Sequence, residues 1–328
     1  MQEREALYDK MKGIGMLLLF WGHLFTYGSV PFSLIFAFHM PLFFFISGLL
    51  LHPTDKYIDY IKKCICKYIV PYIFFWSVGF LIMIVKWAIG LESLDWQGYL
   101  KATLHNLAPN QGYVGAIWFL PVLAVSLVFT NLIVNTSMHK TELGKVGIVL
   151  ALAVTSIFMQ KLPIHIMQVT TLFTTTLFVY IGYLMQGSFI GLVRNKYATL
   201  WLVAALPIFI ILSIFNKTVN LAVPCYNDYV IYLVCALLGI YITAVLANFP
   251  ACKPFAFFGK NSLVIYSTHG MGIAAYAYVL GILLGRPMHY MENIPDVWCF
   301  VGGFVIMLLS IPLYYIFNPI LLKITQKR

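Results

Sequence analysis

The sequence predicts an all-α membrane protein, a polytopic bundle of about ten transmembrane helices with both termini in the cytoplasm. The composition, the spacing of the apolar runs and the placement of the basic residues all support this prediction. Of the 328 residues, 61% are hydrophobic and only 10% are charged, whereas a soluble domain has about 25% charged residues. With a mean hydropathy of +0.88, the chain has too few polar residues to form a surface facing water, so lipid is its main solvent.

Each membrane-spanning helix needs about 20 apolar residues, because the bilayer core is about 30 Å thick. The apolar runs between charged or Gly/Pro-rich breaks give ten candidate spans: 12–29, 32–51, 68–90, 115–135, 145–160, 166–186, 198–216, 227–247, 261–284 and 297–318. No hydrophilic domain interrupts them. We therefore expect a single transmembrane domain over residues 1–328, with no fused soluble domain and no cleavable signal peptide.

The longest outer connection, 91–115, contains the stretch LESLDWQGYLKATLHNL. This stretch predicts a short amphipathic helix lying in the membrane interface, with Trp96 and Tyr99 at the level of the lipid headgroups.

The basic residues predict the orientation. The chain has 21 Lys and Arg against 11 Asp and Glu, a net charge of +10, and basic residues of membrane proteins concentrate in cytoplasmic loops. With the N-terminus inside, 16 of the 21 fall on the cytoplasmic side, and the five left outside are Lys86, Lys101, Lys161, Lys217 and Arg286. Because this asymmetry repeats at every loop, the positive charge reflects topology, and no nucleic-acid partner is expected.

The first span begins with KGIGMLLLFWGH, from Lys12 to His23. Eleven residues make three helical turns plus about 20°, so Lys12 and His23 share one face about 16 Å apart. Asp9 lies one turn before Lys12 on the same side. Lys12 is thus expected at the cytoplasmic rim and His23 in the outer third of the bilayer, where an ionisable group is costly and usually faces a bundle interior or a cavity.

The second span contains a similar feature in FHMPLFFFISG, from Phe38 to Gly48. The short connection at 28–31 makes the first two helices antiparallel neighbours, so His23 and His39 are expected at similar depths. Pro41 cannot donate a hydrogen bond to the carbonyl of Ala37, which predicts a kink and a free carbonyl beside His39. Each histidine could simply hydrogen-bond a neighbouring helix, but two at matched depth favour an acid–base site near the outer side.

Four patterns occur in order along the chain: K-x10-H with Gly13 and Ile14, FHMPLFF with Ser47 and Gly48, WFLPVL at 118–123 and GKNSLVIYSTH at 259–269. Together they resemble the integral-membrane acyltransferase 3 family over essentially the whole chain. The resemblance implies transfer of an acyl group, commonly acetyl, from cytoplasmic acyl-CoA to a carbohydrate on or beyond the outer face. It also implies a location in the cell (inner) membrane and, where an outside protein handles the glycan, a separate periplasmic or extracellular partner.

The resemblance implies roles for the residues of the first two helices. His23 is expected to act as the general base that activates a sugar hydroxyl. Lys12 is expected to bind the phosphates of acyl-CoA, positioned by an ion pair with Asp9. The family often has arginine at the position of Lys12, and lysine lacks the bidentate fork of arginine. His39 could orient His23, hold the acceptor or bind the thioester carbonyl.

Three residues of later helices are candidates for substrate binding. Trp118 is either a membrane-interface anchor or, by the family resemblance, a stacking platform for a sugar ring. On the ninth span, Ser262, Tyr266 and His269 are spaced i, i+4 and i+7 and so form one polar face. Because polar groups in membrane helices usually face the interior, we expect this face to line a cavity.

Other functions receive less support from the sequence. The remaining histidines (His52, His105, His139, His165 and His289) are expected to be solvated loop residues, and the six cysteines are expected to be structural thiols. No spacing typical of a metal site occurs, so no metal is expected, and neither a nucleophile elbow nor a phosphate-binding P-loop is present. A proton-coupled carrier is the main alternative, but it would usually need an intramembrane carboxylate, and Asp228 is the only candidate. A structural membrane subunit would leave the matched histidines unexplained.

Overall fold

The computed structural model describes residues 2–107, 114–162, 167–285 and 295–325. Within these ranges the secondary structure is helical, apart from one isolated β-bridge between Asn220 and Cys225. The first half contains α1 (Gln2–Leu24), α2 (Val30–Phe36), α3 (His39–Leu49), α4 (Tyr57–Cys64), the π-helical turn η1 (Ile65–Ile69), α5 (Val70–Ala88), α6 (Trp96–Asn106), α7 (Phe119–Val134), the 3-10 turn η2 (Met138–Lys140) and α8 (Glu142–Met159). The second half contains η3 (Val169–Thr171), α9 (Leu172–Leu184), α10 (Phe189–Val193), α11 (Ala198–Phe215), α12 (Tyr229–Ala247), η4 (Pro250–Cys252), α13 (Phe255–Lys260), α14 (Ser262–Leu283) and α15 (Asp296–Thr325).

The structure confirms the prediction of a polytopic helical membrane protein. Within the described ranges, seven helical segments are long and apolar enough to cross a bilayer: Val30–Leu49, Tyr57–Ala88, Glu142–Met159, Ala198–Phe215, Tyr229–Ala247, Ser262–Leu283 and Asp296–Thr325. The other three predicted spans also contain helices. Those at Phe119–Val134 and Val169–Leu184 are apolar but shorter, and α1 is charged in its first half.

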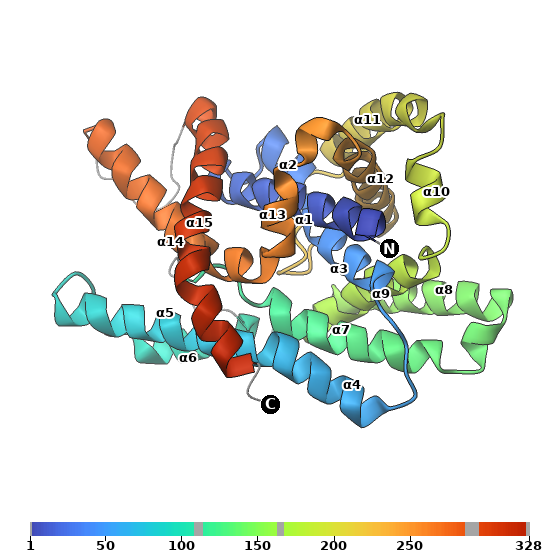
Figure 1. Ribbon diagram of the computed structural model, residues 1–328, viewed down its shortest axis with the longest axis horizontal. Coiled ribbons are helices and arrows are strands. Elements are labelled where there is room, and N and C mark those ends of the chain that lie inside the picture. The colour runs from blue at the N-terminus through green and yellow to red at the C-terminus, as the bar shows by residue number, and fades with distance from the viewer. Residues whose placement is uncertain (1, 108–113, 163–166, 286–294, 326–328) are drawn as a thin grey trace.

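The first helix lies at the centre of the bundle (Figure 1). It packs against α2, α3, α12, α13, α14 and α15, so it is enclosed on most sides by helices from both halves of the chain. Its buried residues, among them Met16, Leu19 and Phe20, belong to the largest hydrophobic cluster. The face that carries the charged and histidine side chains is therefore directed into the protein.

Two pairs of glycines bring helix backbones into direct contact. A methyl group added at Gly13 of α1 would overlap the carbonyl of Phe255 in α13, and one added at Gly259 would overlap the carbonyl of Asp9. Gly48 of α3 and Gly182 of α9 form a similar crossing, against the carbonyls of α9 and α3. Small residues allow such close approach between membrane helices, which gives a physical reason for the glycines in the motifs that begin at Lys12, Phe38 and Gly259.

The second span is broken, as the proline predicts, but the details differ. The break falls at Ala37 and Phe38, between α2 and α3, and Pro41 lies in the first turn of α3. The imidazole of His39 bonds the carbonyl of Ile35. The carbonyl that His39 bonds is therefore two residues before that of Ala37, for which Pro41 has no N–H to donate.

The third span begins earlier than expected. Lys62 and Lys63, which precede the predicted span 68–90, lie on α4, and Lys67 lies on η1. The segments α4, η1 and α5 run as one helical segment from Tyr57 to Ala88. A π-helical turn adds one residue to a turn and is frequent at functional sites. Here it carries Lys67 and Tyr68, both of which line a pocket.

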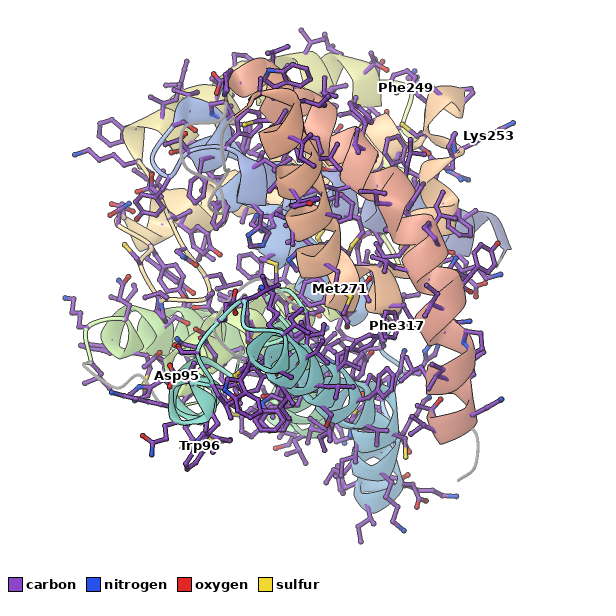
Figure 2. All side chains as sticks on the ribbon, turned by 90° about the vertical axis from the view of Figure 1, so that its left-hand side faces the viewer. Asp95, Trp96, Phe249, Lys253, Met271 and Phe317 are labelled. Atoms are coloured by element: carbon purple, nitrogen blue, oxygen red, sulfur yellow. The ribbon has the colours of Figure 1, made fainter. Side chains whose placement is uncertain are left out.

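A helix is present in the connection where an interfacial helix is expected, as α6, and Asp95 caps it by accepting a hydrogen bond from the backbone of Gly98. Trp96 is exposed, whereas Tyr99 is buried and donates its hydroxyl to the backbone carbonyl of Trp76 in α5. Tyr99 therefore anchors α6 to α5. Figure 2 shows Asp95 and Trp96 at one edge of the molecule and Lys253 at the opposite edge.

Candidate functional site

Lys12 and Asp9 form the ion pair expected of residues one turn apart on α1. The Lys12 ammonium lies 2.8 Å from a carboxylate oxygen of Asp9, and both side chains are about one-fifth exposed, at 20% and 24%. Because α1 is continuous to Leu24, Lys12 and His23 share one face of a single uninterrupted helix. The pair holds the lysine beside the backbone crossing of α1 with α13.

His23 lies against a second histidine, His269 of α14. Their ring centroids are 4.9 Å apart and the ring planes are inclined by 31°. Phe20, one turn before His23, also contacts His269, at 6.5 Å between centroids. Among the described residues His23 forms no hydrogen bond, so its imidazole nitrogens are available to a ligand.

His269 is held on two sides. Its Nδ1–H donates to the backbone carbonyl of Tyr266, and since a carbonyl only accepts, this bond leaves Nε2 as the unprotonated nitrogen of the neutral ring. On another side Gly115 packs against the ring, where an added Cβ would overlap the imidazole. Gly115 also has a φ of +73°, a conformation that only glycine adopts without strain.

His39 is buried near this pair but does not form part of it. Its Nδ1–H donates to the carbonyl of Ile35 at 2.9 Å, and its ring packs against Phe36 with centroids 4.8 Å apart. Phe36 in turn contacts α1 at Gly22, next to His23. The structure therefore brings His39 to the neighbourhood of His23 through Phe36, while the direct ring contact of His23 is with His269.

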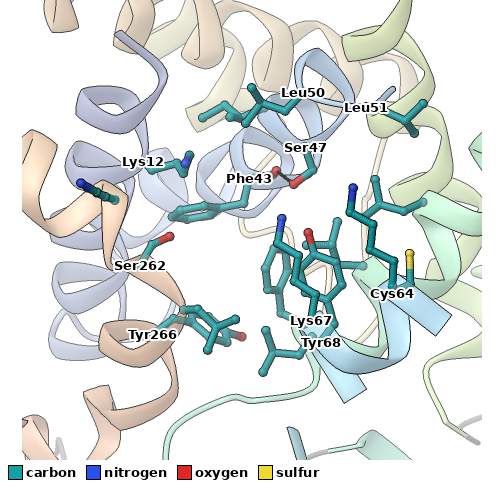
Figure 3. Close-up of a pocket in the computed structure, with 18 of the residues that line it drawn as sticks. Lys12, Phe43, Ser47, Leu50, Leu51, Cys64, Lys67, Tyr68, Ser262 and Tyr266 are labelled. Carbon is teal, nitrogen blue, oxygen red and sulfur yellow. Dashed lines mark hydrogen bonds between the residues drawn. The ribbon is translucent and has the colours of Figure 1, made fainter. Parts of the chain in front are cut away.

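A pocket with a cavity volume of about 300 Å³ begins at Lys12 and extends to Tyr266 (Figure 3). Lys12, Ser262 and Tyr266 reach it from α1 and α14, and Lys67 approaches from the wall formed by α4 and η1. The residues around it include four lysines and no carboxylate: Lys12, Met16, Phe43, Ile46, Ser47, Leu50, Leu51, His52, Tyr60, Lys63, Cys64, Lys67, Tyr68, Phe119, Leu120, Leu123, Leu127, Lys260, Ser262, Leu263 and Tyr266. A concave site with charge of one sign concentrates ligands of the opposite sign.

Tyr266 connects the pocket to the histidines. Its side chain lines the pocket, its ring centroid lies 5.5 Å from that of His269, and the ring of Phe119 lies 5.3 Å away on another side. The Tyr266 hydroxyl donates to the backbone carbonyl of Ala116, next to Gly115. The deep end of the basic pocket, at Tyr266, is thus one helical turn from His269 of the histidine pair.

Trp118 precedes the first residue of α7 and is buried, with 4% of its surface exposed. A buried indole is not an exposed interface anchor, so the structure does not favour that interpretation. The ring contacts Phe119, with centroids 6.5 Å apart, and so it packs behind the wall of the pocket.

The expected polar face of α14 is divided between two environments. Ser262 and Tyr266 line the pocket, and His269 contacts His23 beyond its inner end. Four residues important to this geometry have no site role predicted from the sequence: Lys63, Lys67, Lys260 and Gly115. In the sequence the three lysines stand out only as basic residues predicted on the cytoplasmic side. Gly115 stands out only as a glycine shortly before the WFLP motif.

The other histidines differ from the expectation in one case. His139 is half-buried and bonds the hydroxyl of Tyr180 at 2.9 Å, so the prediction that it is solvated was wrong. Desolvation by burial, helped by the charge of Lys145, lowers the pKa of His139. His52 and His105 are exposed, although His52 lines the pocket. His165 and His289 lie outside the described residues.

Asp228 is the cap of α12. It is exposed, and its carboxylate accepts hydrogen bonds from the backbone of Val230 and Ile231 at the start of α12. Over the described ranges, no three His, Cys, Asp or Glu side chains gather as metal ligands would. The six cysteines are free thiols, and the absence of a metal stays a prediction.

Comparison with known proteins gives one strong result. A family model described as an acyltransferase domain, that of the acyltransferase 3 family, matches residues 7–316. Neither the curated proteins nor the solved structures gave a significant match.

Proposed function

Because the chain belongs to the acyltransferase 3 family, we propose that this membrane acyltransferase moves an acyl group, commonly acetyl, from acyl-CoA in the cytoplasm to a hydroxyl of a cell-surface or exported carbohydrate. The family makes it an enzyme that transfers non-aminoacyl acyl groups, and its apolar helices make it a multi-pass membrane protein. The donor, the acceptor, the cell (inner) membrane as its location and the roles of single residues are parts of the proposal.

The basic pocket is the proposed site of the donor. Coenzyme A carries several phosphate charges, and the four lysines around the pocket have no carboxylate among the other lining residues. Ammonium groups bind phosphates by charge-assisted hydrogen bonds. Beyond the lysines the walls are apolar, with Met16, Phe43 and Leu123 among them, which suits a flexible pantetheine arm ending in an uncharged thioester.

The position of Tyr266 supports this orientation of the donor. An arm that enters past Lys12 and ends at Tyr266 places its thioester one turn from His269 and beside the contact of His269 with His23. Along α1, Lys12 and His23 are about 16 Å apart. The helix therefore spans the distance between a phosphate site near the cytoplasm and a reaction site nearer the outer side.

The reaction needs a base, because a sugar hydroxyl is a weak acid at neutral pH. In the proposed step His23 accepts the hydroxyl proton while the oxygen attacks the thioester carbonyl, which forms the new C–O bond. The tetrahedral intermediate then collapses, the C–S bond breaks, and the proton passes from His23 to the departing sulfur. Atoms and charges balance without any further reactant.

His269 is proposed to assist this proton transfer. With its Nδ1–H donated to Tyr266, its Nε2 is the atom able to accept a hydrogen bond from the protonated His23. His39 has its own Nδ1 bonded to Ile35, so its Nε2 is left to hold the acceptor. Trp118 is proposed to support the wall of the acceptor site.

The carrier alternative loses its main candidate residue. Proton coupling across a membrane usually needs a carboxylate in the transport path, and Asp228 is occupied as the cap of α12. Family membership further favours chemistry over transport.

The single observation that carries the proposal is the pair of histidines next to the inner end of a basic pocket. The test uses membranes containing the wild type or the variants His23→Ala, Lys12→Ala and, as a control, His105→Ala, whose histidine is exposed. Membranes receive acetyl-CoA with a labelled acetyl group, and label in total glycan is counted. We expect transfer by the wild type and control, none by His23→Ala, and a raised KM for Lys12→Ala. Full activity of a correctly inserted His23→Ala protein contradicts the assignment of the base.

A further inference from the structure

Three lysines of the basic pocket also line a second cavity. Lys63, Lys67 and Lys260 border both the pocket that leads to Tyr266 and a groove of about 410 Å³ on their other side. The groove runs between α15 and the segment formed by α4, η1 and the start of α5. The lysines therefore stand on a shared ridge between two cavities.

The charges on this ridge are not neutralised by the protein. All three lysines are exposed, and among the described residues none forms an ion pair with a carboxylate. The ammonium of Lys67 lies 5.2 Å from the ring centroid of Tyr68. Three cations that border the same two cavities together attract an anion that binds there. The ridge thus favours a ligand with at least two negative charges.

The walls of the groove have the chemistry that a purine nucleoside needs. Tyr314 offers an aromatic ring on which a base can stack. Asn318 is half-buried and its amide has no hydrogen-bond partner among the described residues, and an asparagine amide can pair with the N6 and N7 edge of adenine. Leu322 and Val264 supply apolar surface.

We propose that the groove is the binding site for the adenosine end of the acyl-CoA donor, and that the ridge lysines bind its phosphates. The donor then lies across the ridge, with its nucleotide in the groove and its pantetheine arm in the basic pocket. This proposal rests on the proposed function, because it takes coenzyme A as the donor. It assigns Lys63, Lys67 and Lys260 to phosphate binding, and Asn318 and Tyr314 to the base.

The geometry of α15 supplies two substitutions in the groove and a matched control outside it. Asn318, Leu321, Leu322 and Thr325 line the groove and are spaced i, i+3, i+4 and i+7, so they share one helix face. Ile320 is two residues from Leu322, on the opposite face, and is 44% exposed outside the groove. Leu322→Trp fills the groove, Asn318→Leu removes the amide at similar volume, and Ile320→Trp is the control for added bulk.

The test measures binding by calorimetry to the full chain in phosphatidylcholine nanodiscs, with coenzyme A, adenosine 3′,5′-bisphosphate and 4′-phosphopantetheine as separate probes. We expect the Kd for coenzyme A and for the bisphosphate to rise at least tenfold in Leu322→Trp and Asn318→Leu. The Kd for phosphopantetheine should change less than twofold in both, and Ile320→Trp should match the wild type for every probe. Thermal unfolding of each variant, compared with that of the wild type, identifies a misfolded variant independently of the binding data.

Two results overturn the inference while leaving the proposed function intact: unchanged coenzyme A affinity in both groove variants, or an equal loss for coenzyme A and phosphopantetheine. A phospholipid that copurifies with the wild type, is lost in Leu322→Trp and is not displaced by coenzyme A also overturns it, since the groove is then a lipid site. Failure of the proposed donor is distinguishable, because the wild type then binds neither coenzyme A nor phosphopantetheine.

Discussion

The imidazole rings of His23 and His269 lie in direct contact, with centroids 4.9 Å apart, although one belongs to the first helix and the other to the last but one. The two rings are held differently. His269 is fixed by its bond to the Tyr266 carbonyl and by Gly115 behind it, whereas His23 has no hydrogen bond among the described residues. A free base beside an oriented second base is an arrangement suited to accepting and passing on a proton.

The first prediction concerns this pair. His23→Gln should lower kcat by about 10²- to 10⁴-fold, the usual contribution of general acid–base catalysis, and leave the KM for acyl-CoA little changed. His269→Gln should lower kcat less, by about tenfold, because it removes only the partner of the base. Initial rates of labelled acetyl transfer measure both, with His105→Gln as the control. Equal and complete loss in both variants would indicate that the two rings act as one unit.

The second prediction concerns Gly115. Gly115→Ala forces a Cβ into the ring of His269 at a φ of +73°, so it should displace the imidazole and lower kcat by about tenfold or more, since small displacements of catalytic groups are costly. Gly90 supplies the control, because it has a φ of +76° and nothing within 4 Å of an added Cβ. Gly90→Ala carries the same backbone strain, about 1–2 kcal/mol, without touching the site. Equal activity in the two variants would show that the contact with His269 does not matter.

The third prediction concerns the ridge lysines. Lys67→Ala and Lys260→Ala should each raise the KM for acyl-CoA by about tenfold, as expected from the loss of one hydrogen bond to a charged group, with kcat retained. Their effects should shrink at high salt, since salt screens exposed charges. Lys62 is exposed on α4 but lines neither cavity, so Lys62→Ala should behave as wild type. A similar KM for all four proteins would exclude phosphate binding at the ridge.

The fourth prediction is a pH dependence of stability. Burial beside Tyr180 lowers the pKa of His139 in the folded chain. As the pH falls through the ordinary value of 6.5, the unfolded chain takes up the proton first, so the folded state loses stability on acidification. Replacing His139 by Asn should reduce this loss. Thermal unfolding of detergent-solubilised protein at pH 7.5 and 5.5 measures it, and an identical pH dependence in both proteins contradicts the prediction.

The parts of the site that lie on one helix follow from the sequence. The common face of Asp9, Lys12 and His23 needs only the 3.6-residue repeat, and the spans need only the length of apolar runs. The kink near Pro41 likewise follows from local chemistry. Each of these depends on residues close together in the chain.

The contacts between distant helices do not follow in the same way. The spacing on α1 does not say which helix packs against it, so His39, at a similar depth on the next helix, was a plausible partner where the structure places His269. Lys62 and Lys67 are equivalent as cytoplasmic charges, and only the π-helical turn η1 and the packing of α4 decide which faces the pocket. Burial of Trp118 and Tyr99 depends in the same way on tertiary packing.

The last prediction tests the crossing of α1 with α13. A Cβ at Gly259 would overlap the carbonyl of Asp9, and backbone atoms cannot move aside as a flexible side chain does. Gly259→Ala should therefore separate the helices and lower the free energy of unfolding by about 1–3 kcal/mol, the usual cost of overpacking. Because Lys12 and Lys260 lie next to this crossing and both line the pocket, the KM for acyl-CoA should rise as well. Gly147 of α8 has nothing within 4 Å of an added Cβ, so Gly147→Ala should keep its KM and gain stability, since alanine favours a helix by about 1 kcal/mol over glycine. Thermal unfolding and donor kinetics measured on both variants decide the matter: a Gly259→Ala protein as stable and as active as Gly147→Ala would mean that the close approach of the two backbones does not position the pocket.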